Sequence, residues 1–203
     1  MKNEKSFERE LPTGYKEALY INAKNLGFGL IFNLIALLVL AGVMALAFLS
    51  LGWGEKTLEL EADPIGMMIA SVVFIAAMIG YIILHELVHG LAYKALTGER
   101  LTFGLSWSCA FCGVPDVYTY RRTAIIAVTA PLVSFTVLFI PLLIALYFLS
   151  PLYYLLTAFL FGLHLGGCSG DIYVFLLLMT KFKSKSTLMR DTGPEQFFYL
   201  PEE

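Results

Sequence analysis

The feature that most constrains this chain is a set of long stretches that carry almost no formal charge. Residues 25–54 and 64–84 contain no Lys, Arg, Asp or Glu, and residues 123–180 contain only Asp171. A transmembrane helix needs about 20 consecutive, mostly apolar residues. Charged residues make up 15% of the chain, whereas soluble domains carry about 25%. These observations exclude an ordinary soluble domain and predict a membrane protein.

The three stretches predict four transmembrane helices, because the last stretch is long enough to cross a bilayer twice. The Ser150-Pro151 step within it is typical of a turn between two helices. The expected fold class is therefore an all-α membrane protein. Its predicted spans are residues 27–51, 65–93, 124–149 and 152–179.

The distribution of Lys and Arg predicts which side of the membrane each connection faces, because cytoplasmic loops are enriched in these residues. The first 24 residues carry five of them, and the loop after the first span has only Lys56 beside four acidic residues. The second loop carries Arg100, Arg121 and Arg122, and the tail begins with three lysines. We therefore expect both termini in the cytoplasm. The polar-rich N-terminus does not have the layout of a signal peptide.

One motif in the second predicted span carries ionisable side chains, His85-Glu86-Leu87-Val88-His89. Residues four apart share a face of a helix, so the two imidazoles can bind one zinc ion. Glu86 is then placed to act on a water molecule that the metal activates. A buried polar cluster that only ties helices together, or a path for protons or metal ions, would use the same residues. Ionisable groups inside a membrane tend to mark functional sites, which favours the metal site.

A catalytic zinc ion needs a third protein ligand and one open position. Asp171 is the only carboxylate in the fourth predicted span; it lies ten residues before Lys181, and His85 lies nine residues before Lys94. Both are therefore about 13–15 Å from the cytoplasmic boundary at 1.5 Å per residue. We expect Asp171 to be the third ligand of one zinc ion per chain. His164 is the alternative ligand, or else a substrate-pocket residue, a support for the ligands or a satisfied core histidine.

Small residues in the fourth predicted span indicate a close helix contact. Gly162, Gly166 and Gly170 repeat every four positions. Glycines at this spacing let the backbone of another helix approach closely.

These residues resemble the site-2 protease family of intramembrane zinc metalloproteases. The resemblance consists of the motif at residues 85–89, an Ala-Pro-Leu segment at 130–132 and a later Gly170-Asp171. More closely, HELVHG followed by a cytoplasmic loop, the Ala-Pro-Leu segment and a Gly-Asp-Ile segment resemble the putative zincin peptidases, a family of uncharacterised function. The resemblance covers about residues 65–180.

The resemblance implies a division of the chain into a catalytic core and accessory parts. Many site-2 proteases have an Asn and a Pro where this chain has Cys168-Ser169. The implied parts are a cytoplasmic N-terminal segment at 1–26, an accessory helix at 27–51, a three-helix zinc metalloprotease core at 65–180 and a cytoplasmic tail at 181–203.

The loop between the second and third spans contains a candidate β-hairpin. Residues 101–108 alternate apolar and polar side chains, which predicts a strand. Residues 117–120 are its expected partner, and residues 109–116 the connection. A strand edge near a protease site can bind an extended peptide by strand addition. An amphipathic loop lying on the lipid headgroups is the alternative.

The three cysteines are too few for a disulfide scaffold. Cys109 and Cys112 form a C-x-x-C in the predicted cytosolic loop, and Cys168 lies within a span. The pair could be half of a zinc site, a redox pair, or two half-buried small residues. The last interpretation is favoured, because the chain has no second C-x-x-C to complete a four-thiolate site.

The sequence as a whole predicts a membrane-embedded zinc endopeptidase that acts on membrane-associated proteins or peptides. His85, His89 and Asp171 are its expected metal ligands and Glu86 its general base, and the site opens towards the cytoplasm. The net charge of −2 gives no reason to expect a nucleic-acid partner. The expected partners are a substrate and the lipid bilayer, and the oligomeric state stays open. The alternatives are a non-enzymatic metal transporter and an inactive protease-like scaffold.

The C-terminal tail starts basic and ends acidic. Its lysines are expected to anchor to anionic headgroups. Its aromatic segment at residues 197–200 either docks on the core or stays mobile.

Overall fold

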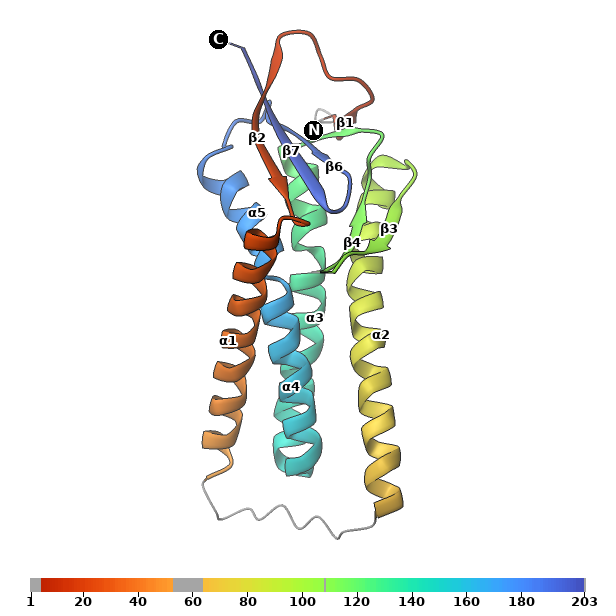
Figure 1. Cartoon of the computed structure of the whole chain (residues 1–203), viewed down its shortest axis with the longest axis vertical. Helices are drawn as coiled ribbons and strands as arrows, with labels where there is room; N and C mark the ends of the chain where they lie inside the picture. The colour runs from red at the N-terminus through yellow and green to blue at the C-terminus, as the bar shows by residue number, and fades with distance from the viewer. Residues whose placement is uncertain (1–4, 53–63, 108, 203) are drawn as a thin grey trace. The chain divides into compact units, whose positions relative to one another are not determined.

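The computed structural model describes residues 5–52, 64–107 and 109–202 (Figure 1). Its helices are α1 (Leu26–Ser50), α2 (Pro64–Thr97), α3 (Arg121–Leu149), α4 (Pro151–Gly167) and α5 (Ser169–Thr180). Its strands are β1 (Phe7–Glu8), β2 (Tyr15–Asn22), β3 (Thr102–Leu105), β4 (Ala110–Gly113), β5 (Tyr118–Tyr120), β6 (Leu188–Asp191) and β7 (Glu195–Pro201).

The helices agree closely with the four predicted spans. Helices α1, α3 and the Ser71–Thr97 part of α2 are long and apolar enough to cross a membrane, and the bent pair of α4 and α5 makes a fourth span if it is counted as one. The fourth predicted span is thus broken at Cys168. Ser150 caps the N-terminus of α4 and Pro151 is its first residue, as the predicted turn requires. The acidic residues 55–63, on which the predicted orientation relies, lie outside the described residues.

The prediction of an all-α fold is wrong, because the chain also forms a five-stranded sheet. Its strand order is β1-β5-β6-β7-β2, and each neighbouring pair is antiparallel. The long pair joins the two ends of the chain, since Tyr15 lies opposite Pro201 and Asn22 opposite Glu195 (Figure 1). Three of its four pairings, β1 with β5, β5 with β6 and β2 with β7, join segments far apart in sequence, so local alternation does not reveal the sheet.

The predicted pairing of residues 101–108 with 117–120 is also wrong. The chain reverses earlier, where the Ser106 backbone N–H donates to the Cys109 carbonyl at 2.8 Å. β3 therefore pairs with β4, and Phe103 lies opposite Cys112. β5 pairs instead with β1 and β6 in the larger sheet. Residues that were expected to be the connection thus form the second strand of the hairpin.

The chain divides into two compact units, which we describe separately. Unit 1 runs to Phe32, from His85 to Pro131 and from Gly170 onwards, and unit 2 covers Asn33–Leu84 and Leu132–Ser169.

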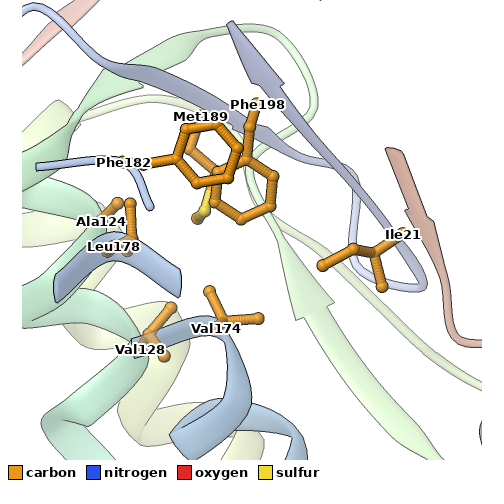
Figure 2. Packing of buried hydrophobic residues seen from close by; sticks show 8 residues of the cluster. All are labelled: Ile21, Ala124, Val128, Val174, Leu178, Phe182, Met189 and Phe198. Carbon is orange, nitrogen blue, oxygen red and sulfur yellow. The ribbon is translucent and has the colours of Figure 1, made fainter. Parts of the chain in front are cut away.

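The core of unit 1 packs the sheet against α3 and α5. Phe182 stacks on Phe198 with ring centroids 4.7 Å apart. Both rings and Met189 are fully buried. Figure 2 shows the cluster, which consists of Ile21, Ala124, Val128, Val174, Leu178, Phe182, Met189 and Phe198. The aromatic segment of the tail therefore docks on the core through Phe198.

Unit 2 contains the close helix contact that the glycines predict. A Cβ atom on Gly166 would lie 2.6 Å from the Ala36 carbonyl oxygen, and one on Gly162 would lie 3.2 Å from the Cα of Leu40. Because both neighbours belong to α1, the helix that packs on this glycine face is the first span. A Cβ on Gly170 would meet nothing within 4 Å, so the contact ends before Gly170.

Candidate metal centre

Two histidines stand one helical turn apart on α2, within unit 1. His85 and His89 are 8% and 7% exposed, and their ring centroids are 5.0 Å apart. The helix is unbroken from Pro64 to Thr97. It therefore presents both imidazoles on one face, as the four-residue spacing predicts.

Asp171 reaches this pair from the first turn of α5. Its Oδ2 atom lies 3.3 Å from Nε2 of His85, and its Oδ1 atom lies 3.4 Å from Nε2 of His89. One ligand atom from each of the three residues lies within 4.8 Å of the others. The structure therefore brings together all three side chains that the sequence predicts as ligands. The break at Cys168 places Asp171 near the positive end of a helix dipole, which favours its negative charge.

The donor set and its spacing fit a zinc ion. Two imidazole nitrogens and a carboxylate oxygen are common ligands of catalytic zinc. Zinc–ligand distances of about 2.0–2.1 Å in tetrahedral geometry separate neighbouring ligand atoms by about 3.3 Å. Each Nε2 atom lies at about that distance from one of the two Asp171 oxygens, 3.3 Å from Oδ2 for His85 and 3.4 Å from Oδ1 for His89. Among the described residues, Asp171 Oδ2 is a buried side-chain oxygen without a hydrogen-bond partner. A cation at this position would satisfy it.

The orientation of His89 leaves its Nε2 atom available to a metal. Nδ1 of His89 lies 2.8 Å from the carbonyl oxygen of Ala127 on α3. A carbonyl oxygen can only accept, so Nδ1 carries the proton and donates it. In the neutral imidazole the lone pair is then on Nε2, the atom that faces Asp171. This arrangement is the usual outer-sphere support of a zinc-bound histidine.

A proline explains why the Ala127 carbonyl is available. In a helix this oxygen would accept from the backbone N–H of the residue four positions later. That residue is Pro131, which has no N–H. Pro131 therefore leaves an unused acceptor inside α3, and His89 supplies its donor. Sequence reasoning missed this role of Ala127, although the signal was the proline of the Ala-Pro-Leu segment.

Glu86 follows His85 on α2 and is half-buried. Its carboxylate lies close enough to both histidines, to Asp171 and to the backbone of Cys112 to interact with them electrostatically. The β3–β4 hairpin that carries Cys112 is held close to α2, because a Cβ on Gly90 would lie 2.7 Å from the ring of Phe103. Glu86 thus lies next to the three candidate ligands and is contacted by a strand.

The cysteines of the hairpin do not form a disulfide. Cys109 and Cys112 are both reduced, and Cys112 is buried. Burial, together with the nearby carboxylates of Asp191 and Glu86, raises the pKa of the Cys112 thiol to about 12. A thiol with so high a pKa is a poor nucleophile or metal ligand at neutral pH. This observation favours the interpretation of two small, partly buried residues.

His164 belongs to unit 2 and has its own partners there. It is fully buried. Its Nδ1 atom lies 2.9 Å from the Tyr81 hydroxyl, and its Nε2 atom lies 3.2 Å from Oγ1 of Thr136. Aromatic rings of Tyr81, Phe135, Phe139 and Phe161 surround it. Both ring nitrogens are paired, as in a satisfied core histidine.

Comparison with known proteins gave one match. The model of a family described as "Putative zincin peptidase" matches residues 78–185, just over half of the chain. No curated protein and no solved structure matches the chain significantly. The matched segment contains His85, Glu86, His89, Pro131 and Asp171.

The role of Pro131 predicts the effect of one substitution. Pro131→Ala supplies an N–H that competes with His89 for the Ala127 carbonyl, so it should weaken zinc binding by up to about tenfold. The measurement is the zinc dissociation constant of the detergent-purified chain, by competition with a chromophoric chelator. Pro141→Ala makes the same change elsewhere in α3 and serves as the control. Equal dissociation constants for both variants and the wild type would contradict the role of Pro131.

Proposed function

The chain belongs to the putative zincin peptidase family, and from this premise we propose that it is a membrane-embedded zinc endopeptidase. One observation carries the proposal: the side chains of His85, His89 and Asp171 converge within 4.8 Å beside Glu86. The family match and this group of ligands suggest a zinc peptidase. Hydrolysis of membrane-associated proteins or peptides is our extension of that suggestion.

The proposed mechanism assigns each residue one task. His85, His89 and Asp171 would hold the zinc ion. A metal held there would supply Lewis acidity, which polarises a carbonyl and lowers the pKa of water. Glu86 takes the proton of the attacking water as general base and delivers it to the leaving amine as general acid. The backbone of Cys112, which lies beside the Glu86 carboxylate, would help to position it.

The substrate is proposed to be a segment of a membrane protein or peptide in extended form. The proposed ligands lie on α2 and α5, which belong to the candidate spans. A transmembrane helix keeps its backbone carbonyls in internal hydrogen bonds, so it must unwind before it can be cleaved. The β3–β4 hairpin, whose Cys112 contacts Glu86, offers a strand along which an unwound segment could pair.

We expect the chain to hold about one zinc ion, as a three-ligand catalytic site does. Elemental mass spectrometry of the detergent-purified wild type measures this directly. Asp171→Ala should lose the metal because it removes a ligand. His164→Gln should keep it, because both His164 nitrogens already have partners. The opposite pattern, with zinc lost only in His164→Gln, would make His164 the third ligand.

Glu86→Gln should stop cleavage while zinc stays bound. The amide keeps the size of the side chain but cannot accept the proton, so we expect the rate to fall at least about a hundredfold. Because the substrate is unidentified, the measurement is mass-spectrometric profiling of new N-termini in membranes from cells that produce the wild type or the variant. Glu99→Gln, which alters a glutamate paired with Arg9 at 2.8 Å, is the matched control. Undiminished cleavage by Glu86→Gln would rule out the mechanism and favour a transporter or a scaffold.

Both termini are proposed to be cytoplasmic, with the site open to that side. If α4 and α5 together cross the membrane once, the chain has four spans and both termini lie on the same side. The Lys and Arg bias of the segments outside the spans favours the cytoplasm as that side. Epitope tags at the two ends, probed by protease digestion of sealed vesicles of known orientation, should then be accessible from the same side. Tags on opposite sides would show three crossings and overturn the proposed topology.

A further inference from the structure

The hairpin formed by β6 and β7 contacts both helices that carry the candidate ligands. Its contact with α2 is a hydrogen bond from the Tyr93 hydroxyl to Oδ2 of Asp191, at 2.7 Å. Tyr93 is 1% exposed and Asp191 is 4% exposed. Tyr93 follows His89 by one helical turn, so it continues the face of α2 that presents His85 and His89. Asp191 therefore binds α2 on the same face as the two imidazoles.

Asp191 is itself held by the turn that follows it. Its Oδ1 atom accepts from the backbone N–H of Gly193 at 2.9 Å. Its backbone carbonyl accepts from the N–H of Val114, next to β4, at 2.8 Å. Both carboxylate oxygens thus have donors, and the residue links α2, the β6–β7 turn and the end of β4.

The turn also packs on β4 backbone against backbone. A Cβ atom on Gly113 would overlap the backbone atoms of Thr192 and Gly193. Gly193 has a φ of 102°, a conformation that side-chain-bearing residues rarely adopt. Glycines at both positions therefore allow a contact with little freedom to shift. The same β4 strand supplies the Cys112 backbone contact to Glu86.

The contact of the hairpin with α5 is apolar. Met189 of β6 and Phe198 of β7 pack in one buried cluster with Val174 and Leu178 of α5 (Figure 2). Val174 lies three residues after Asp171, nearly one turn along the same helix. The hairpin is thus attached to α5 close to the carboxylate ligand, just as it is attached to α2 close to the imidazole ligands.

We propose that the β6–β7 hairpin is a clamp that holds α2 and α5 at the spacing zinc binding requires, with Asp191 and Tyr93 as its positioning residues. This inference rests on the proposed zinc site. The ligands come from two helices far apart in sequence, so their spacing is not fixed by either helix alone. The Tyr93–Asp191 bond joins one ligand helix to the element already packed on the other.

The experiment compares metal binding by full-length chains purified in detergent. The probe is Co²⁺, which occupies zinc sites and whose visible absorption bands report ligand geometry. The variants are Tyr93→Phe, which removes only the hydroxyl, Asp191→Asn, which removes one acceptor and the charge, and the double variant. Tyr15→Phe is the matched control, because it removes another hydroxyl bond to the tail, from Tyr15 to the Ser186 carbonyl at 2.9 Å.

The clamp predicts a Co²⁺ dissociation constant about tenfold higher in both single variants, with shifted absorption bands. The Co²⁺ dissociation constant of the double variant should be no higher than that of the single variant that binds Co²⁺ less tightly, because both changes break the same bond. Tyr15→Phe should match the wild type. Circular dichroism and size-exclusion chromatography check that each variant remains folded.

Other outcomes overturn the inference in distinguishable ways. Unchanged binding and spectra in folded Tyr93→Phe would show that the bond does not position the ligands. An equal loss in Tyr15→Phe would show a general effect of loosening the sheet. No Co²⁺ or zinc binding by the folded wild type would refute the proposed metal site, and the clamp with it.

Discussion

The organisation of the site depends on one buried carboxylate that lies between two imidazoles. An isolated carboxylate in an apolar environment carries a large desolvation penalty, so it needs a cationic partner at close range. Asp171 meets the imidazoles of His85 and His89 at 3.3 and 3.4 Å, and its Oδ2 atom has no hydrogen-bond partner within the part of the chain that the structure describes. A divalent cation would satisfy all three side chains at once. The contact between α2 and α5, and the break before α5, together place Asp171 beside the two imidazoles.

The same need to satisfy buried polar groups governs the backbone around the site. A proline in a transmembrane helix leaves a carbonyl that another group must pair with. In α3 the carbonyl is that of Ala127, and the donor is Nδ1 of His89. One pairing therefore satisfies the helix and fixes the tautomer that leaves Nε2 for a metal. A residue with no side-chain polarity, Pro131, thereby contributes to the orientation of a candidate ligand.

Features that arise from local spacing and from depth in the predicted spans were predictable from the sequence, and the pairing of strands across the chain was not. Charge-free stretches predict the helices, and a four-residue spacing on one helix places His85 beside His89. His85 and Asp171 were expected at the same distance from the cytoplasmic boundary, which correctly suggested that Asp171 would reach the two imidazoles. The five-stranded sheet escaped prediction because β2 pairs with β7, more than 170 residues away. Asp191 gave no local signal either, since its significance comes from Tyr93 on a distant helix.

The sheet supplies a hydrophobic driving force for packing, which helices in lipid lack. Apolar helices surrounded by lipid gain no hydrophobic driving force from each other, so their spacing depends on close packing and polar contacts. A metal site with ligands on two helices tolerates little sliding between them. In unit 1 both ends of the chain enter one sheet, and its buried face packs on α3 and α5 through Phe198 and Met189. Its strands are not part of the candidate spans, and removing such an apolar face from water would be favourable. Burial of this face can therefore stabilise the positions of the ligands on the neighbouring helices.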